Sequence, residues 1–323
     1  METRKLGNSD LQITRVGFGA WAIGGPGWEF AWGPQDDSDS IAAIHAALEI
    51  GVNWVDTAAV YGMGHSEEIV ASALKSWRGA RPYVFTKCVL RWDAQGKITP
   101  NHSAASIRQE CEDSLRRLQI DTIDLYQMHW PPRDPGPALE EAWTAMHELQ
   151  KAGKVRWIGV SNFDVAQMRR AQGIAPVTSN QPPYSIVRRA VEAEVLPYCQ
   201  QQGIGTISYA PMASGLLSGG MTRERAAALP VDDFRSRNPE FRDPRLTKNL
   251  QLVERLRRVG ARHDRGPGEV AIAWVLRHPA ITGAIVGARN AQQAKSIMRA
   301  GDLKLSAEEI AEIETAAAAA TAR

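Results

Sequence analysis

The chain has few of the residues that could cross-link it or hold a structural metal. It contains three cysteines in 323 residues, Cys88, Cys111 and Cys199, and no two of them have C-x-x-C spacing. A small, odd number of widely spaced cysteines does not favour a disulfide framework or a zinc site. We therefore expect no metal and reduced thiols in a cytoplasmic protein.

The sequence also lacks an excess of charge of one sign and any long apolar run. Its 38 basic and 36 acidic residues give a net charge of +2, so no electrostatic footprint for nucleic acid is present. An uncharged stretch at residues 199–222 is interrupted by Gly, Ser and Pro and does not predict a membrane span. The N-terminal METRKLGNSDLQ has no apolar segment typical of a secretory signal. Nucleic acid and membranes are therefore not expected as partners.

Short apolar runs alternate with amphipathic helical stretches along the whole chain. Eight such pairs follow a hairpin at residues 4–14, and no linker rich in Pro, Gly or Ser divides them. Strands that alternate with helices imply parallel pairing, and eight units predict a (β/α)8 TIM barrel. We predict one domain, residues 1–323, with an N-terminal β-hairpin and extra C-terminal helices. The helix at 246–263 is assigned to the seventh unit, and the helices at 267–277 and from Ser306 are the extra ones.

Four polar residues stand where predicted strands end. Asp56 ends NWVD, Tyr61 follows it, Lys87 ends YVFTK and His129 ends IDLYQMH. Because all strand ends on one rim of a parallel barrel converge, we expect these side chains to share a pocket. An ammonium group lowers the pKa of a nearby phenol, so Tyr61 is predicted to be a general acid tuned by Lys87. Asp56 would hold Lys87, and His129 would either donate a hydrogen bond to a substrate carbonyl or help to relay the proton.

Each of these residues alone also has a structural interpretation, as packing or as an ion pair, and only their joint placement favours catalysis. A second pattern, GFGAWA, fits a loose dinucleotide-binding fingerprint. That fingerprint requires a helix to begin at once, whereas GGPGWEFAWGP follows here and indicates a loop.

The chain resembles the aldo-keto reductase family over nearly its whole length. The similarity lies in GVNWVDTAAVYGMGHSEEIV, the Lys of FTKC, the His of DLYQMHWP, WIGVSNF, NQPPYS and YAPMASGLLSG. It implies reduction of aldehyde or ketone carbonyls with NADPH, and with NADH as a further possibility, with Asp56, Tyr61, Lys87 and His129 as the catalytic tetrad. Its partners would be small carbonyl or alcohol substrates.

The resemblance also implies a set of cofactor contacts. Ser161, Asn162 and Gln181 would hold the nicotinamide carboxamide, and Tyr209 would stack on the ring. The other positions lie at the first strand end, in the segment after Tyr209 and in the last unit; they are Ala20, Trp21, Asp56, Met212, Gly215, Leu216, Ser218, Gly287, Arg289 and Gln293.

The sequence departs from the family pattern at two places. Gly220 stands where a lysine is common, and Arg223 is the candidate to replace it. Ser296-Ile297 stands where a Glu-Asn pair often binds adenine. Arg289 beside the ribose favours NADPH, because a guanidinium suits the geometry of a phosphate.

Tryptophan is abundant, with 10 residues. Those in loops after strand ends either pack the loops or form an aromatic wall for ring-bearing or sugar-like carbonyl substrates; they are Trp28, Trp32, Trp92 and Trp130. Two other functions stay open. One is a cofactor-binding regulatory subunit resembling potassium-channel beta subunits, and the other is a metal-dependent barrel hydrolase, for which only Asp56 and His129 would qualify as ligands.

Overall fold

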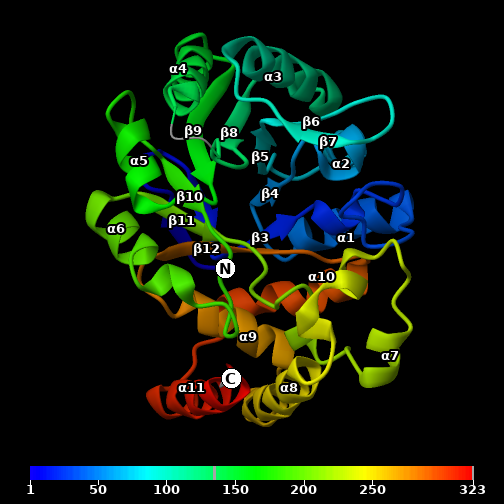
Figure 1. Cartoon of the computed structure of the whole chain (residues 1–323). Coiled ribbons are helices and arrows are strands. Elements are labelled where there is room, and N and C mark those ends of the chain that lie inside the picture. The colour runs from blue at the N-terminus through cyan, green and yellow to red at the C-terminus, as the bar shows by residue number, and fades with distance from the viewer. Residues whose placement is uncertain (134–135, 322–323) are drawn as a thin grey trace.

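The computed structural model describes residues 1–133 and 136–321 and contains a closed barrel of eight parallel strands (Figure 1). This confirms the predicted (β/α)8 fold; residues 134–135 and 322–323 of the predicted domain lie outside the described part. Around the barrel the strands are β3 (Val16–Gly19), β4 (Trp54–Asp56), β5 (Tyr83–Cys88), β8 (Ile123–Met128), β9 (Val155–Ser161), β10 (Ser179–Gln181), β11 (Gly205–Ser208) and β12 (Ile281–Val286).

The predicted N-terminal hairpin covers the amino-terminal end of the barrel. Its strands β1 (Thr3–Lys5) and β2 (Gln12–Thr14) pair antiparallel. Leu6 and Leu11 are fully buried in a cluster with barrel-interior side chains such as Trp54. Gly7 (φ +54°) turns the hairpin so closely onto the barrel that an added Cβ would lie 2.1 Å from the carbonyl oxygen of Thr178, the residue before β10. The hairpin does not cover the opposite end of the barrel, where the strands have their carboxyl ends.

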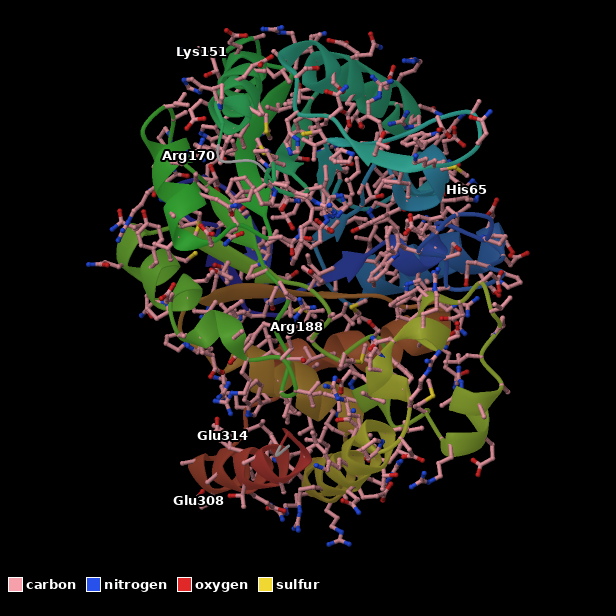
Figure 2. All side chains as sticks on the ribbon, in the orientation of Figure 1. His65, Lys151, Arg170, Arg188, Glu308 and Glu314 are labelled. Atoms are coloured by element: carbon pink, nitrogen blue, oxygen red, sulfur yellow. The ribbon has the colours of Figure 1, made fainter. Side chains whose placement is uncertain are left out.

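Helices surround the barrel and bury two outer cores against it. Side-chain caps fix several of their starts; Ser103, for example, accepts a hydrogen bond from the Ser106 N–H. Charged side chains such as Lys151 and Glu308 point outward (Figure 2). In chain order the helices are α1 (Asp37–Glu49), α2 (His65–Ser76), α3 (Ala104–Leu118), α4 (Ala138–Lys151), α5 (Val165–Gln172), α6 (Val195–Gln202), α7 (Arg223–Ala227), α8 (Arg245–Ala261), α9 (Pro267–Leu276), α10 (Ala291–Ile297) and α11 (Ala307–Thr321).

The two helices before the last strand exchange the roles that we predicted. Helix α9 packs on β12, and all ten of its residues are buried. Helix α8 instead packs outside, against α9 and α11. The physical reason is visible in the sequence, because PGEVAIAWVL is apolar on every side, whereas α8 has one apolar face. The extra helices are therefore α8 and α11.

The connections at the carboxyl ends of the strands carry elements that we did not predict. Strands β6 (Leu90–Trp92) and β7 (Ile98–Pro100) form an antiparallel hairpin after β5. The segment between β11 and α8 contains α7 and short 3₁₀ helices. The 3₁₀ helices of the chain are η1 (Trp21–Ile23), η2 (Tyr61–Gly64), η3 (Ala190–Glu192), η4 (Leu216–Ser218), η5 (Phe234–Arg237), η6 (Pro239–Phe241) and η7 (Met298–Asp302).

Candidate active site

A cavity of about 700 Å³ opens at the carboxyl ends of the barrel strands. Seven of the eight strands contribute a lining residue at their end or just beyond it. These residues are Gly19, Asp56, His129, Ser161, Gln181, Tyr209 and Gly287. The cavity therefore lies where loops of a parallel barrel can combine side chains that are distant in sequence.

Lys87 lies at the centre of the predicted tetrad. Its Nζ donates to Asp56 Oδ1 at 2.5 Å, to the Thr57 carbonyl at 2.8 Å and to Tyr61 Oη at 3.3 Å. The ring of His129 meets the ring of Tyr61 edge to face, with centroids 5.8 Å apart. The structure thus brings Asp56, Tyr61, Lys87 and His129 together in one cluster.

The second oxygen of Asp56 is also fully engaged. Oδ2 accepts from Gln127 Nε2 at 3.1 Å and from Gln181 Nε2 at 2.9 Å. Asp56 is 2% exposed and Lys87 is 1% exposed, and such a buried ion pair is tolerable only when its remaining hydrogen-bonding capacity is satisfied. Gln127 of β8 was not predicted; its place in the strand IDLYQMH, on the same face as Leu125 and His129, is the signal that indicates it.

The protonation states differ from our prediction at Tyr61. Burial, together with the negative charge of Asp56, raises the pKa of the Tyr61 phenol well above 10 instead of lowering it. The prediction considered Lys87 alone, but Asp56 lies nearer to the ammonium than the phenol does. Burial also lowers the pKa of Lys87, against the effect of Asp56, while burial and the charge of Lys87 hold the pKa of His129 well below 6.5. The cluster therefore contains a protonated phenol and a neutral imidazole.

Most of the predicted cofactor contacts line the cavity. Tyr209 Oη donates to Asn162 Oδ1 at 2.9 Å, and Asn162 Nδ2 donates to the His129 carbonyl at 3.0 Å. Leu216 is the exception, because its side chain is fully buried in a small cluster with Met221 and does not line the cavity. The predicted residues that do line it are Ala20, Trp21, Asp56, Ser161, Asn162, Gln181, Tyr209, Met212, Gly215, Ser218, Gly287, Arg289 and Gln293.

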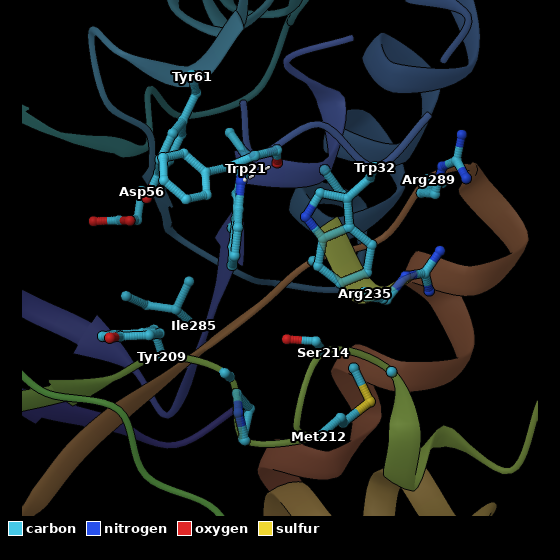
Figure 3. Close-up of a pocket in the computed structure, with 18 of the residues that line it drawn as sticks. Trp21, Trp32, Asp56, Tyr61, Tyr209, Met212, Ser214, Arg235, Ile285 and Arg289 are labelled. Carbon is cyan, nitrogen blue, oxygen red and sulfur yellow. Dashed lines mark hydrogen bonds between the residues drawn. The ribbon is translucent and has the colours of Figure 1, made fainter. Parts of the chain in front are cut away.

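Three arginines line the cavity away from the tetrad. Figure 3 shows Asp56, Tyr61 and Tyr209 on one side and Arg235 and Arg289 on the other. Burial lowers the pKa of Arg289, and the neighbouring Arg235 and Arg225 lower it further, with Asp233 opposing. Arg235 is paired with Asp233 Oδ2 at 2.5 Å, so this wall gathers three guanidinium groups around one carboxylate and keeps a positive charge suited to an anion.

Arg223 does not replace the family lysine as predicted. Its guanidinium donates to Asp243 Oδ2 and to Thr247 Oγ1, both at 2.6 Å, and it does not line the cavity. The exposed Arg225 lies in the cavity wall instead, with Nη1 donating to the Gly220 carbonyl at 3.0 Å. Arg225 and Arg235 were missed because they lie in the irregular segment after β11, which has no periodic pattern.

Aromatic side chains form the wall beside Tyr61. Trp28, Trp32 and Trp130 line the cavity as predicted, and Phe30 joins them. Trp92 does not, because the β6–β7 hairpin directs it into a separate hollow, where its ring lies 5.8 Å from the Arg117 guanidinium. Among the described residues, no group of three His, Cys, Asp or Glu side chains could hold a metal ion. Within the same residues, no helix has the length and apolar content to cross a bilayer.

Comparisons with known proteins agree with this geometry. The Aldo/keto reductase family matches residues 15–318. Aldo-keto reductase YhdN of Bacillus subtilis is 39% identical over 98% of this chain and 93% of its own length. An NADH-specific methylglyoxal reductase of Escherichia coli is 33% identical, covering 95% of each chain.

Solved structures are similar as well. The glycerol dehydrogenase AKR11B4 of Gluconobacter oxydans superposes with a TM-score of 0.88 at 36% identity, covering 98% of this chain and 95% of that one. The aldo-keto reductase AKR11C1 of Bacillus halodurans, in its holo form, gives a TM-score of 0.79 at 30% identity, covering 98% and 96%. The chain belongs to the aldo/keto reductase family and is an oxidoreductase.

Proposed function

We propose that the protein reduces aldehyde or ketone carbonyls with a nicotinamide dinucleotide and prefers NADPH. The observation that carries the proposal is the presence, in one cavity, of a proton-donating cluster around Tyr61 and a separate arginine group containing Arg235 and Arg289. NADPH has an uncharged nicotinamide ring, which would lie near the Tyr61 cluster, and phosphate groups, which would lie near the arginines.

The residues of the cavity fit such a cofactor. Ser161, Asn162 and Gln181 offer amide and hydroxyl groups for a carboxamide, and Tyr209 offers a ring for stacking. Gly215 and Ser218 line the cavity near the arginines, where anionic phosphates would be held. When bound, the cofactor would supply a hydride to the carbonyl carbon.

The side chains around Lys87 would complete the reaction. Tyr61, held by Lys87 Nζ at 3.3 Å, would give its proton to the carbonyl oxygen as negative charge develops there. The neutral His129 would orient that oxygen by a hydrogen bond. Lys87, paired with Asp56 at 2.5 Å, would stabilise the phenolate that Tyr61 becomes.

The aromatic wall favours uncharged substrates with an apolar substituent. The indole N–H groups of Trp21 and Trp28 donate to the backbone carbonyls of Phe30 and Gly25, each at 3.1 Å. A substrate would therefore meet the aromatic rings rather than these donors. This supports an apolar or ring-bearing carbonyl over an anionic one and over the sugar-like carbonyl that the sequence also left open.

The first experiment is a titration of the purified protein with NADPH and with NADH, followed by quenching of tryptophan fluorescence. We expect tighter binding of NADPH, followed by NADPH oxidation in a panel of neutral aldehydes and ketones. Tighter binding of NADH, the cofactor named for the Escherichia coli relative, would contradict the NADPH preference but not the reductase. Binding of neither would contradict both the preference and the reductase, and would leave only a partner-binding role without a cofactor.

Arg289→Ala tests how the preference arises. Arg289 Nε donates to Gln35 Oε1 at 2.7 Å, which holds the guanidinium at the cavity wall. We expect the variant to bind NADPH about tenfold or more weakly, the loss typical of a charged hydrogen bond, and NADH almost unchanged. Arg223→Ala, outside the cavity, is the matched control. Equal losses for both cofactors would show that Arg289 does not distinguish them.

A further inference from the structure

The peptide group between Cys88 and Val89 connects two residues of the tetrad. It begins one residue after Lys87, and its carbonyl oxygen, on Cys88, accepts a hydrogen bond from the His129 N–H at 3.3 Å. Its N–H, on Val89, donates to Glu110 Oε2 at 2.9 Å. A single peptide group therefore links a carboxylate on α3 to the backbone of His129.

Val89 has a backbone conformation that depends on its surroundings. Its φ is +78°, in the left-handed region that a β-branched residue rarely adopts. The residue is fully buried, and its carbonyl accepts from the Asn101 N–H at 2.7 Å. Because the conformation is unfavourable in itself, the groups that hold the peptide must maintain it, and Glu110 is the acceptor for its N–H.

Glu110 lies outside the reaction cavity. It is 5% exposed, and its other oxygen, Oε1, accepts from Ser106 Oγ at 2.8 Å. Its carboxylate borders a hollow of about 180 Å³ between α3 and the β6–β7 hairpin, which is also lined by Ala59, Arg91, Trp92, Asp113 and Arg117. Glu110 can therefore exchange a proton through this hollow but is not among the residues that line the cavity.

The surroundings of Glu110 place its titration near neutral pH. Burial raises the pKa of Glu110 to about 7, while hydrogen bonds from Ser106 and Val89 and the charges of Arg91 and Arg117 oppose the rise. The other titratable groups that face it are Asp113 on its own helix, Cys88 on β5 and Tyr126 on β8. Arg117 is itself paired with Glu67 of α2 at 2.6 Å.

We propose that Glu110 is a positioning residue: its carboxylate holds the Cys88–Val89 peptide, and through that peptide the backbone at Lys87 and His129. A charged acceptor forms the stronger hydrogen bond and also polarises the bond that the same peptide accepts from His129. Protonation of Glu110 weakens both. The catalytic consequence rests on the proposed reductase function, whereas the structural link does not.

Hydrogen–deuterium exchange of the whole protein tests the link directly. In Glu110→Ala we expect the peptides containing Val89 and His129 to exchange about tenfold faster or more, as these amides lose protection. Glu112→Ala is the matched control, because Glu112 is an exposed residue of the same helix that pairs with Lys154. Glu110→Gln retains a neutral acceptor oxygen, like the protonated carboxyl, and should give protection between that of Glu110→Ala and that of the wild type at pH 8. Unchanged exchange in Glu110→Ala would overturn the proposal.

The pH dependence provides a second test that does not require Glu110→Ala to fold. In the wild type, exchange at these amides, corrected for its intrinsic rate, should slow between pH 6 and pH 8 as Glu110 ionises. Glu110→Gln should remove that change, and its persistence would overturn the proposal.

Turnover then tests the catalytic consequence. We expect Glu110→Ala to lower kcat by about tenfold or more through misplacement of the tetrad, with KM and cofactor affinity unchanged. Glu110→Gln should have, at every pH, the lower kcat of the protonated wild type and so lose the inflection near pH 7. If the wild type reduces no carbonyl, the proposed function fails, while the exchange experiments still decide the structural link.

Discussion

The state of Tyr61 depends on how Lys87 divides its hydrogen bonds. Lys87 Nζ lies 2.5 Å from Asp56 Oδ1 and 3.3 Å from Tyr61 Oη. The nearby carboxylate therefore opposes the lowering of the phenol pKa that the ammonium alone would cause. Burial then dominates and keeps the phenol protonated. A donor that holds its proton until charge develops on the carbonyl oxygen is suited to act as a general acid.

Replacement of Tyr61 by Phe tests this role. The ring and its packing against Trp28 remain, but the transferable proton is lost. We expect kcat to fall by roughly 10²–10⁴ and the dissociation constant for the cofactor to stay within about twofold. Single-turnover kinetics and a fluorescence titration measure the two quantities. Near-wild-type turnover would assign proton donation to another group.

Some site residues could be predicted from sequence and others could not, for physical reasons. Asp56 and Lys87 end apolar runs, so the barrel geometry alone places them on one rim. Trp92 also follows a strand end, but a short hairpin turns it outward, which a single strand's pattern does not encode. In the sequence, nothing distinguishes Glu110 from an ordinary helical residue. Its proposed positioning role follows only from the hydrogen bond that it accepts from the Val89 N–H.

The raised pKa of Glu110 also predicts how stability changes with pH. An ordinary glutamate titrates near 4.5, so between pH 4.5 and about 7 the folded state binds more protons at this site than the unfolded state. The free energy of unfolding should therefore fall as pH rises through this window, by on the order of 3 kcal/mol from this group. Glu110→Gln should gain in Tm relative to the wild type as pH rises, whereas Glu112→Gln should not. A pH-independent difference for Glu110→Gln would contradict the raised pKa.

At the scale of elements, two loops meet over the cavity. The first follows β3 and includes residues 28–32, and the second, the strap segment, comprises residues 231–237. The Phe234 N–H donates to the Ala31 carbonyl at 3.3 Å, and Arg237 Nη2 donates to the Glu29 carbonyl at 2.7 Å. The ring of Phe234 stacks on Trp21 with centroids 4.9 Å apart. These contacts were beyond prediction from sequence, because both loops lack periodicity and lie 200 residues apart.

Phe234→Ala should loosen the strap segment. Aromatic pairs contribute about 0.5–1.5 kcal/mol each beyond burial, and Phe234 pairs with both Trp21 and Trp32. We expect the bound dinucleotide to dissociate roughly 10-fold faster, with little change in the hydride-transfer step. Stopped-flow displacement measures the rate, and Val231→Ala, at an exposed position of the same segment, is the control. Identical rates for the two variants would show that the strap segment does not retain the ligand.

The molecule as a whole separates stability from chemistry along the barrel axis. The hairpin packs Leu6, Leu11 and Ile13 into one end, while the tetrad lies at the other. The alternation of strands and helices was sufficient to predict that the tetrad shares one rim, because a parallel barrel has one rim for each end of its strands, but it did not place the hairpin at the other end. To predict that α9 rather than α8 packs on the barrel, one must also compare their sequences, because α9 is apolar on every side and α8 is amphipathic.

Leu11→Ala tests the separation of the two ends. Leu11 is fully buried, so the truncation leaves a cavity among side chains such as Trp54 and should cost about 2–5 kcal/mol of unfolding free energy. We expect a clear drop in Tm with kcat and cofactor affinity unchanged at temperatures where the variant is folded. Leu229→Ala, in the segment after β11 and only partly buried, should lower Tm much less. A fall in kcat for Leu11→Ala at full folding would mean that the hairpin end is coupled to the tetrad through the barrel interior, a result that the rigid packing of Trp54 against Phe85 argues against.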